Sequence, residues 1–135
     1  MLKFTKRKYY IKYLYLVINE VGRYKIGMSI NVESRMKTLK YSGGVSINLV
    51  QKWPTEFAST FEEFLHIKYN QYHHFGEWFN IPYNPEDEIY YLYTEFCKET
   101  ENRSIYDSTG IIKNLEKFLP KGAVSHKRSG RLARY

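Results

Sequence analysis

The sequence predicts an α+β fold of mixed helices and strands, in which a small three-stranded sheet is flanked by helices. Short runs of β-branched, aromatic and leucine residues predict the strands, and apolar residues at intervals of three and four predict the helices. An aromatic content of 18% favours a packed domain over a disordered chain. At 135 residues we expect one core that needs no disulfide.

The first two strands are expected to form a hairpin. Tyr13–Ile18 and Arg23–Met28 have strand composition, and the turn segment Asn19–Gly22 joins them. A short helix is then expected from about Asn31 to Tyr41, because Asn31 offers a helix cap and apolar residues follow at helical spacing. The breaker Ser42-Gly43-Gly44 ends this helix.

A third strand should follow and run up to Pro54. Its apolar residues keep to alternate positions, an arrangement typical of a strand. These residues are Val45, Ile47, Leu49 and Trp53.

The best-defined helix is expected between Glu56 and His73, where apolar residues fall on one side. Glycine and proline limit the aromatic segment His74–Pro82 to a turn and a brief extended piece. Further helices are expected from Pro85 to Glu99, where acids at the start suit the macrodipole, and from Gly110 to Leu119.

Positive charge is concentrated at the two ends. The formal net charge is +7, yet residues 1–12 and 121–135 hold five cations each and no acid, which leaves the middle at −3. Basic arms suit a polyanionic partner whose phosphates release counterions on binding, although solvated, disordered ends would have the same composition. We expect a basic arm (1–12), a core (13–82), a helical extension (83–120) and a basic tail (121–135).

Nothing in the composition points to secretion or to a membrane. The single cysteine, Cys97, cannot form an intramolecular disulfide. The longest apolar run, Tyr13–Ile18, is far shorter than the roughly 20 residues of a membrane-spanning helix, and no small-residue cleavage site follows it. We therefore expect an intracellular protein that is not secreted.

The hairpin brings together two residues with reactive side chains. Because side chains alternate across a strand, Tyr15 shares a face with Tyr13, and Lys25 lies opposite the apolar set of its own strand. If the two apolar sets pack together, Tyr15 and Lys25 emerge side by side, where each lowers the cost of ionising the other. A half-exposed strand with a solvated lysine would show the same spacing.

The middle helix separates two glutamates. Glu63 lies almost opposite the apolar arc and should face water, whereas Glu62 lies on the edge of that arc. A carboxylate at this border suits magnesium, which often takes only one or two protein ligands, but an ordinary helix-flank glutamate is the alternative. His66, one turn on, could hydrogen-bond a phosphate or pack at the core edge.

Arg35 lies on the flank of the apolar stripe of the first helix. Its planar fork could bind a phosphate or form a surface ion pair. The remaining histidines and the cysteine do not predict zinc, because His66, His73, His74 and Cys97 lack a paired-ligand spacing.

In order and spacing these residues resemble the GIY-YIG nuclease superfamily, in the branch common in phages and large DNA viruses. Tyr13-Leu14-Tyr15 resembles the first motif, and Lys25-Ile26-Gly27 resembles the second, with lysine in place of the usual tyrosine. Arg35 matches the family arginine and Glu62 the metal-binding glutamate. Glu77-Trp78-Phe79 resembles the closing motif of that branch.

The resemblance covers about residues 13–82 and implies a GIY-YIG-like fold and a metal-dependent endonuclease that hydrolyses phosphodiester bonds in DNA. Mg²⁺, or Mn²⁺ in its place, would be held by Glu62, and the products would carry a 5′-phosphate and a 3′-hydroxyl. Either Tyr15 or Lys25 would take a proton from water, with a pKa lowered from about 10. Leu39 replaces the histidine or tyrosine that the family usually has.

The resulting candidate residues fall into three groups. The catalytic candidates are Tyr15, Lys25, Arg35 and Glu62. The accessory candidates are Tyr13, Tyr24, His66 and Asn80. The candidates for contact with nucleic acid are Lys6, Arg7, Lys8, Lys127, Arg128 and Arg131.

Two other functions fit the same sequence. A non-catalytic nucleic-acid-binding protein could retain the GIY-YIG-like fold, and an interaction protein could use its aromatic surface to bind another protein. For the nuclease we expect a nucleic-acid partner, DNA rather than RNA, no membrane, and a monomer or homodimer in the cytoplasm or nucleus of a host cell.

Overall fold

The computed structural model describes residues 11–43 and 46–122. In these ranges the chain has a mixed α+β fold. The strands are β1 (Lys12–Asn19), β2 (Tyr24–Ser29), β3 (Ile47–Thr55), β4 (His73–Phe75) and β5 (Trp78–Phe79). The α-helices are α2 (Val32–Gly43), α3 (Ala58–Lys68), α4 (Glu86–Thr100) and α5 (Ile111–Asn114). The 3₁₀ helices are Asn70–Tyr72 and Glu116–Phe118.

The sheet is antiparallel and has five strands in the order β3-β1-β2-β5-β4. The expectation of a three-stranded sheet was therefore wrong. The three long strands were predicted, but β4 and β5 come from the segment expected to form a turn and a brief extended piece. Strands of two and three residues have no detectable periodicity, and they are defined only by their pairing. β5 pairs with β2, where Tyr24 faces Phe79 and Lys25 faces Trp78, and β4 pairs with β5.

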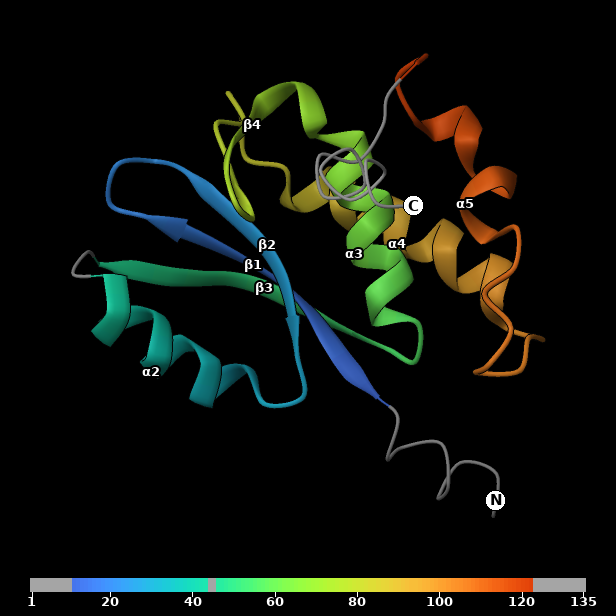
Figure 1. Cartoon of the computed structure of the whole chain (residues 1–135), viewed down its shortest axis with the longest axis horizontal. Coiled ribbons are helices and arrows are strands. Elements are labelled where there is room, and N and C mark those ends of the chain that lie inside the picture. The colour runs from blue at the N-terminus through green and yellow to red at the C-terminus, as the bar shows by residue number, and fades with distance from the viewer. Residues whose placement is uncertain (1–10, 44–45, 123–135) are drawn as a thin grey trace, which may run out of the picture.

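Helices cover both faces of the sheet (Figure 1), with α2 on one face and α3 and α4 on the other. Beneath α3 and α4 lies the larger core, which includes Leu14, Leu16 and Ile26 of the hairpin. Beneath α2 lies a smaller core centred on Tyr15 and Val17. The alternation of the hairpin strands thus gives each face its own core, and Tyr15 faces α2.

A β-bulge in the β1–β3 pair reverses the faces of β3. Leu16 faces Gln51 and Val17 faces Leu49, so Val50 is an additional residue on β3. As a result Ile47 packs in the smaller core and Trp53 in the larger one, although both were expected at regular alternate positions. Leu49 is exposed, and Val45 lies outside the described residues.

Segments C-terminal to the sheet complete the larger core. Ile89, Leu92 and Phe96 of α4, together with Ile111 and Leu115, are buried in it. The C-terminal helices therefore pack against the α3 face and leave the Tyr15 face to α2.

Several predicted boundaries differ from the observed ones. Asn31 caps α2 as expected, because its Oδ1 accepts a hydrogen bond from Ser34 N at 3.0 Å. However, α2 extends through Gly43, and the expected 56–73 helix ends at Lys68. The expected 110–119 helix is divided into α5 and a 3₁₀ turn. No helix of the described residues is long and apolar enough to cross a membrane.

Candidate functional site

The candidate site lies along the edge of β2 that β5 leaves uncovered. β5 pairs with β2 only at Tyr24 and Lys25, and Ile26 N adds a hydrogen bond to Glu77 O at 3.1 Å. Beyond Ile26, side chains of the described residues approach β2 from three places. They come from α2, from α3 and from Glu77, the residue before β5.

Tyr15 approaches this edge across Gly27, its partner in the β1–β2 pair. The tyrosine is 1% exposed. A Cβ atom at position 27 would lie 2.5 Å from Tyr15 Oη and 3.1 Å from Glu77 Oε1. Glycine at position 27 therefore leaves the space in which the hydroxyl and the carboxylate meet, a role that comes from close approach rather than from backbone conformation.

Arg35 of α2 reaches the same hydroxyl. Its Nε donates a hydrogen bond of 3.4 Å to Tyr15 Oη. Burial raises the pKa of Tyr15 above its ordinary value, and the bond from Arg35 opposes that effect in part. The direction is opposite to the lowered pKa expected from the sequence, because Tyr15 is enclosed beneath α2 rather than displayed on an open face.

Lys25 lies on the same face as Tyr15, as the alternation predicted, and it pairs across the sheet with Val17. Its side chain is only 8% exposed, so the alternative of a solvated lysine was wrong. Lys25 Nζ is 3.1 Å from Glu77 Oε1 and 5.5 Å from the ring centre of Trp78. A carboxylate and an aromatic ring therefore contact the buried ammonium.

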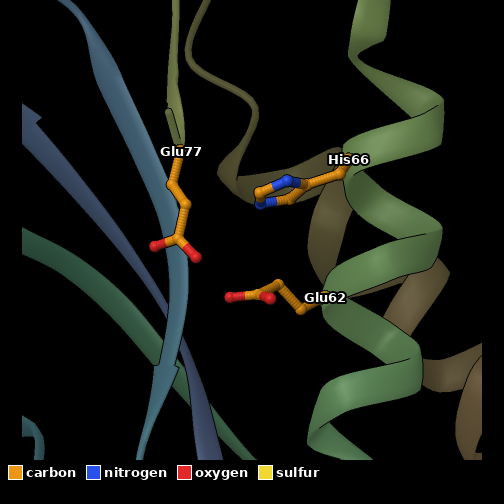
Figure 2. A group of neighbouring side chains, drawn as sticks. All are labelled: Glu62, His66 and Glu77. Atoms are coloured by element: carbon orange, nitrogen blue, oxygen red, sulfur yellow. The ribbon is translucent and has the colours of Figure 1, made fainter. Parts of the chain in front are cut away.

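Glu62 and His66 reach the edge from α3. Glu62 is 5% exposed and His66 is fully buried. One potential ligand atom from each of Glu62, His66 and Glu77 lies within 4.8 Å of the other two. Figure 2 shows these side chains converging between α3 and the strand β2. Glu62 is buried and Glu63 is partly exposed, in agreement with the two sides of the helix on which the apolar pattern placed them.

His66 has a defined structural role. Its Nε2 is 2.8 Å from Ile26 O, and its ring contacts Phe79 edge-on at 5.0 Å. A carbonyl oxygen only accepts, so Nε2 carries the hydrogen and donates it. His66 thus packs at the core edge, the second of the two roles considered from the sequence, and joins α3 to β2.

Of the other accessory candidates, Tyr13 packs against the smaller core that contains Tyr15, whereas Tyr24 and Asn80 contact residues outside the cluster. Tyr24 is buried in the larger core on the opposite face. Asn80 accepts a hydrogen bond of 2.9 Å from Arg23 Nε. The Lys52 ammonium lies over the ring of Tyr13, with Nζ 4.8 Å from the ring centre. The six basic candidates, Lys6, Arg7, Lys8, Lys127, Arg128 and Arg131, lie outside the described residues.

Glu77 is the site residue that the sequence reasoning did not select. It appeared only as part of a family motif, and its partners depend on the pairing of β5 with β2. Its side chain is 25% exposed, so it lies where the site opens to solvent. Glu77 belongs to the cluster through its contact with Lys25 and its proximity to Glu62.

The donor set fits a divalent cation. Two carboxylates from different elements can supply the oxygen ligands that Mg²⁺ and Mn²⁺ prefer. Arg35 and Tyr15 lie beside these carboxylates, so a bound phosphate could contact a cation and a guanidinium together.

Comparison with known protein families gives a match over most of the described residues. The family model of the T5orf172 domain matches residues 11–97, a range that includes every described residue of the cluster. No curated protein and no solved structure gives a match. The T5orf172 domain is phage-associated and related to nucleases of the GIY-YIG and HNH types. The chain therefore belongs to the T5orf172 domain family.

Proposed function

We propose that the protein is a magnesium-dependent endonuclease that hydrolyses phosphodiester bonds in DNA. One observation carries this proposal: Glu62 and Glu77 converge with Tyr15, Lys25 and Arg35 around one uncovered strand edge. These five residues come from five different segments of the chain: β1, β2, α2, α3 and the turn before β5. A merely structural ion pair would not require a tyrosine hydroxyl, a guanidinium and two carboxylates at one point.

Hydrolysis would divide the work among these residues. Glu62 holds the cation, which when bound supplies charge neutralisation at the scissile phosphate and at the leaving oxygen. Arg35 donates hydrogen bonds to the phosphoryl oxygens as their negative charge increases, because its guanidinium is partly exposed and adjacent to the cluster.

Proton transfer involves the Tyr15 face of the sheet. A water oxygen bonds to phosphorus, the bond from phosphorus to the 3′-oxygen breaks, and the water gives up one proton as the leaving oxygen takes one. Tyr15 as its phenolate, or Lys25 as its neutral amine, would accept the proton from water, so whichever group acts must first lose its own proton. Since burial raises the pKa of Tyr15, its phenol is protonated at neutral pH, and positive charge close to Oη is needed for it to act as a base.

The domain family supports nucleic acid as the substrate class. The T5orf172 match indicates a nuclease or nucleic-acid-binding role. Five cations at each end of the chain would add affinity for the backbone that decreases steeply with salt. The competing proposal is a non-catalytic nucleic-acid-binding protein, which would show this salt dependence without cleavage.

The test uses the full chain with supercoiled plasmid, single-stranded DNA and RNA, each with Mg²⁺, with Mn²⁺ or with a chelator. We expect metal-dependent nicking of DNA and products that carry a 5′-phosphate. Glu62→Gln should abolish nicking, and Glu63→Gln, its neighbour on the same helix, should retain it. Salt-sensitive binding without nicking under any of these conditions would favour the non-catalytic protein and contradict the proposal.

A further inference from the structure

Glu77 lies between two kinds of partner. On one side Lys25 Nζ is 3.1 Å from Oε1, and on the other Glu62 offers an oxygen within 4.8 Å of a Glu77 oxygen. Both the Lys25 ammonium and the Glu62 carboxylate are largely buried. Two carboxylates this close together repel each other strongly when water is scarce, so their charge requires a compensating cation.

In the absence of metal, Lys25 supplies that compensation. A divalent cation between Glu62 and Glu77 would supply it as well, with two positive charges in place of one. Because the ammonium and the divalent cation would then repel each other beside the same carboxylate, they compete for Glu77.

We propose that Glu77 is the second carboxylate ligand of the cation site, and that Lys25 is its counter-ion in the metal-free chain, displaced from Glu77 when a divalent cation binds. The inference rests on the proposed function in locating the cation at Glu62. It goes further by giving Glu77 and Lys25 opposite effects on cation affinity.

The surroundings of Lys25 provide a second contact for the displaced ammonium. Lys25 Nζ already lies 5.5 Å from the ring centre of Trp78, on the sheet face that also carries Tyr15. An ammonium that leaves Glu77 can keep this cation–π contact without returning to water. Lys25 would then be free to meet a phosphate or the attacking water only after the cation is bound.

The test measures Mn²⁺ binding to the full chain by calorimetry, with no nucleic acid present. Glu77→Gln keeps the side-chain shape and removes the charge, and should weaken Mn²⁺ binding by about tenfold or more. Lys25→Met removes the competing charge and should tighten Mn²⁺ binding several-fold, whereas Lys25→Arg should bind as wild type does. The matched controls are Glu63→Gln and Lys52→Met, which should leave the affinity unchanged.

A folding measurement accompanies these titrations, because Lys25→Met removes the ammonium that pairs with Glu77. Thermal unfolding of Lys25→Met should show a larger stabilisation by Mn²⁺ than wild type does. Weaker or unchanged Mn²⁺ binding by a folded Lys25→Met, or a stabilisation by Mn²⁺ no larger than that of wild type, would overturn the role of Lys25. Unchanged binding by Glu77→Gln would overturn the role of Glu77.

The inference and the proposed function can fail separately. DNA cleavage by wild type, together with unchanged Mn²⁺ affinity in Glu77→Gln, would overturn the inference and leave the nuclease standing. The predicted order of Mn²⁺ affinities without cleavage of any substrate would support the inference and overturn the nuclease.

Discussion

Gly27 faces Tyr15 across the β1–β2 pair, and the tyrosine hydroxyl occupies the space that a side chain at position 27 would need. The same space admits the carboxylate of Glu77 from the other side. Tyr15 can therefore contact the cluster because residue 27 has no side chain.

Gly27→Ala should reduce cleavage while the fold is retained. The added methyl group would lie 2.5 Å from Tyr15 Oη, and Tyr15 is too buried to move aside freely. We expect a cleavage rate lowered about 100-fold, since small displacements in an active site have effects of this size. Overpacking should lower the free energy of unfolding by about 1–3 kcal/mol. Met28→Ala serves as a control and should cleave as wild type does. If Gly27→Ala also cleaves at the wild-type rate, the close approach of Tyr15 to Gly27 has no role in cleavage.

Arg35→Met should reduce cleavage with a modest loss of stability. Arg35 is half-buried and donates to Tyr15 Oη, so its loss removes one preorganised donor from the site. We expect a loss of about 100-fold in rate at saturating DNA and a decrease of about 1 kcal/mol in unfolding free energy, the usual contribution of one hydrogen bond. Arg35→Lys should restore little, because an ammonium lacks the planar fork. Full activity in Arg35→Lys would contradict a role that requires the guanidinium.

His66→Ala should destabilise the protein whether or not a cation is present. The substitution leaves Ile26 O without its donor and opens a cavity beside Phe79. We expect the unfolding free energy, measured with urea, to fall by about 2–4 kcal/mol. The exposed His74 serves as a control, and His74→Ala should stay within about 0.5 kcal/mol of wild type. Equal stability of the two variants would refute the structural role of His66.

Alkaline pH should unfold the protein through tyrosines joined to Glu88. Tyr69 and Tyr83 donate to Glu88 Oε1 at 2.5 and 2.8 Å. Burial first, and then this bond, raises the pKa of Tyr69 far above its ordinary value and that of Tyr83 to about 12.

The sign of this effect follows from proton linkage, because the folded chain holds these protons more tightly than the unfolded chain does. The stabilisation is complete below about pH 10, the pKa of an unfolded tyrosine, and is lost as the pH rises from there through the folded values. The unfolding free energy, measured with urea across this pH range, should decrease less steeply with pH for Tyr69→Phe than for wild type. If the unfolding free energies of Tyr69→Phe and wild type decrease equally with pH, Tyr69 does not contribute to the alkaline unfolding.

The sequence predicted those parts of the fold that local periodicity encodes. The hairpin and α3 have strong apolar patterns, so their faces followed from spacing alone, including the separation of Glu62 from Glu63. The face shared by Tyr15 and Lys25 was predicted for the same reason.

Features that depend on long-range pairing could not be predicted in this way. The bulge at Val50 moves Trp53 to the opposite face from Ile47 without any mark in the local sequence. The pairing of β5 with β2 places Glu77 beside Lys25, so Glu77 was identified as a site residue only from the structure. The position of α2 over Tyr15 likewise reversed the expected direction of its pKa shift.

The most direct test of the account compares cleavage and binding of one DNA substrate by wild type and Glu62→Gln in the same Mg²⁺ buffer. The account predicts a rate at least about 100-fold lower for Glu62→Gln, with DNA affinity within a few-fold of wild type. Equal cleavage rates for the two proteins, or a loss of cleavage that parallels an equal loss of DNA binding, would contradict a cation site at Glu62.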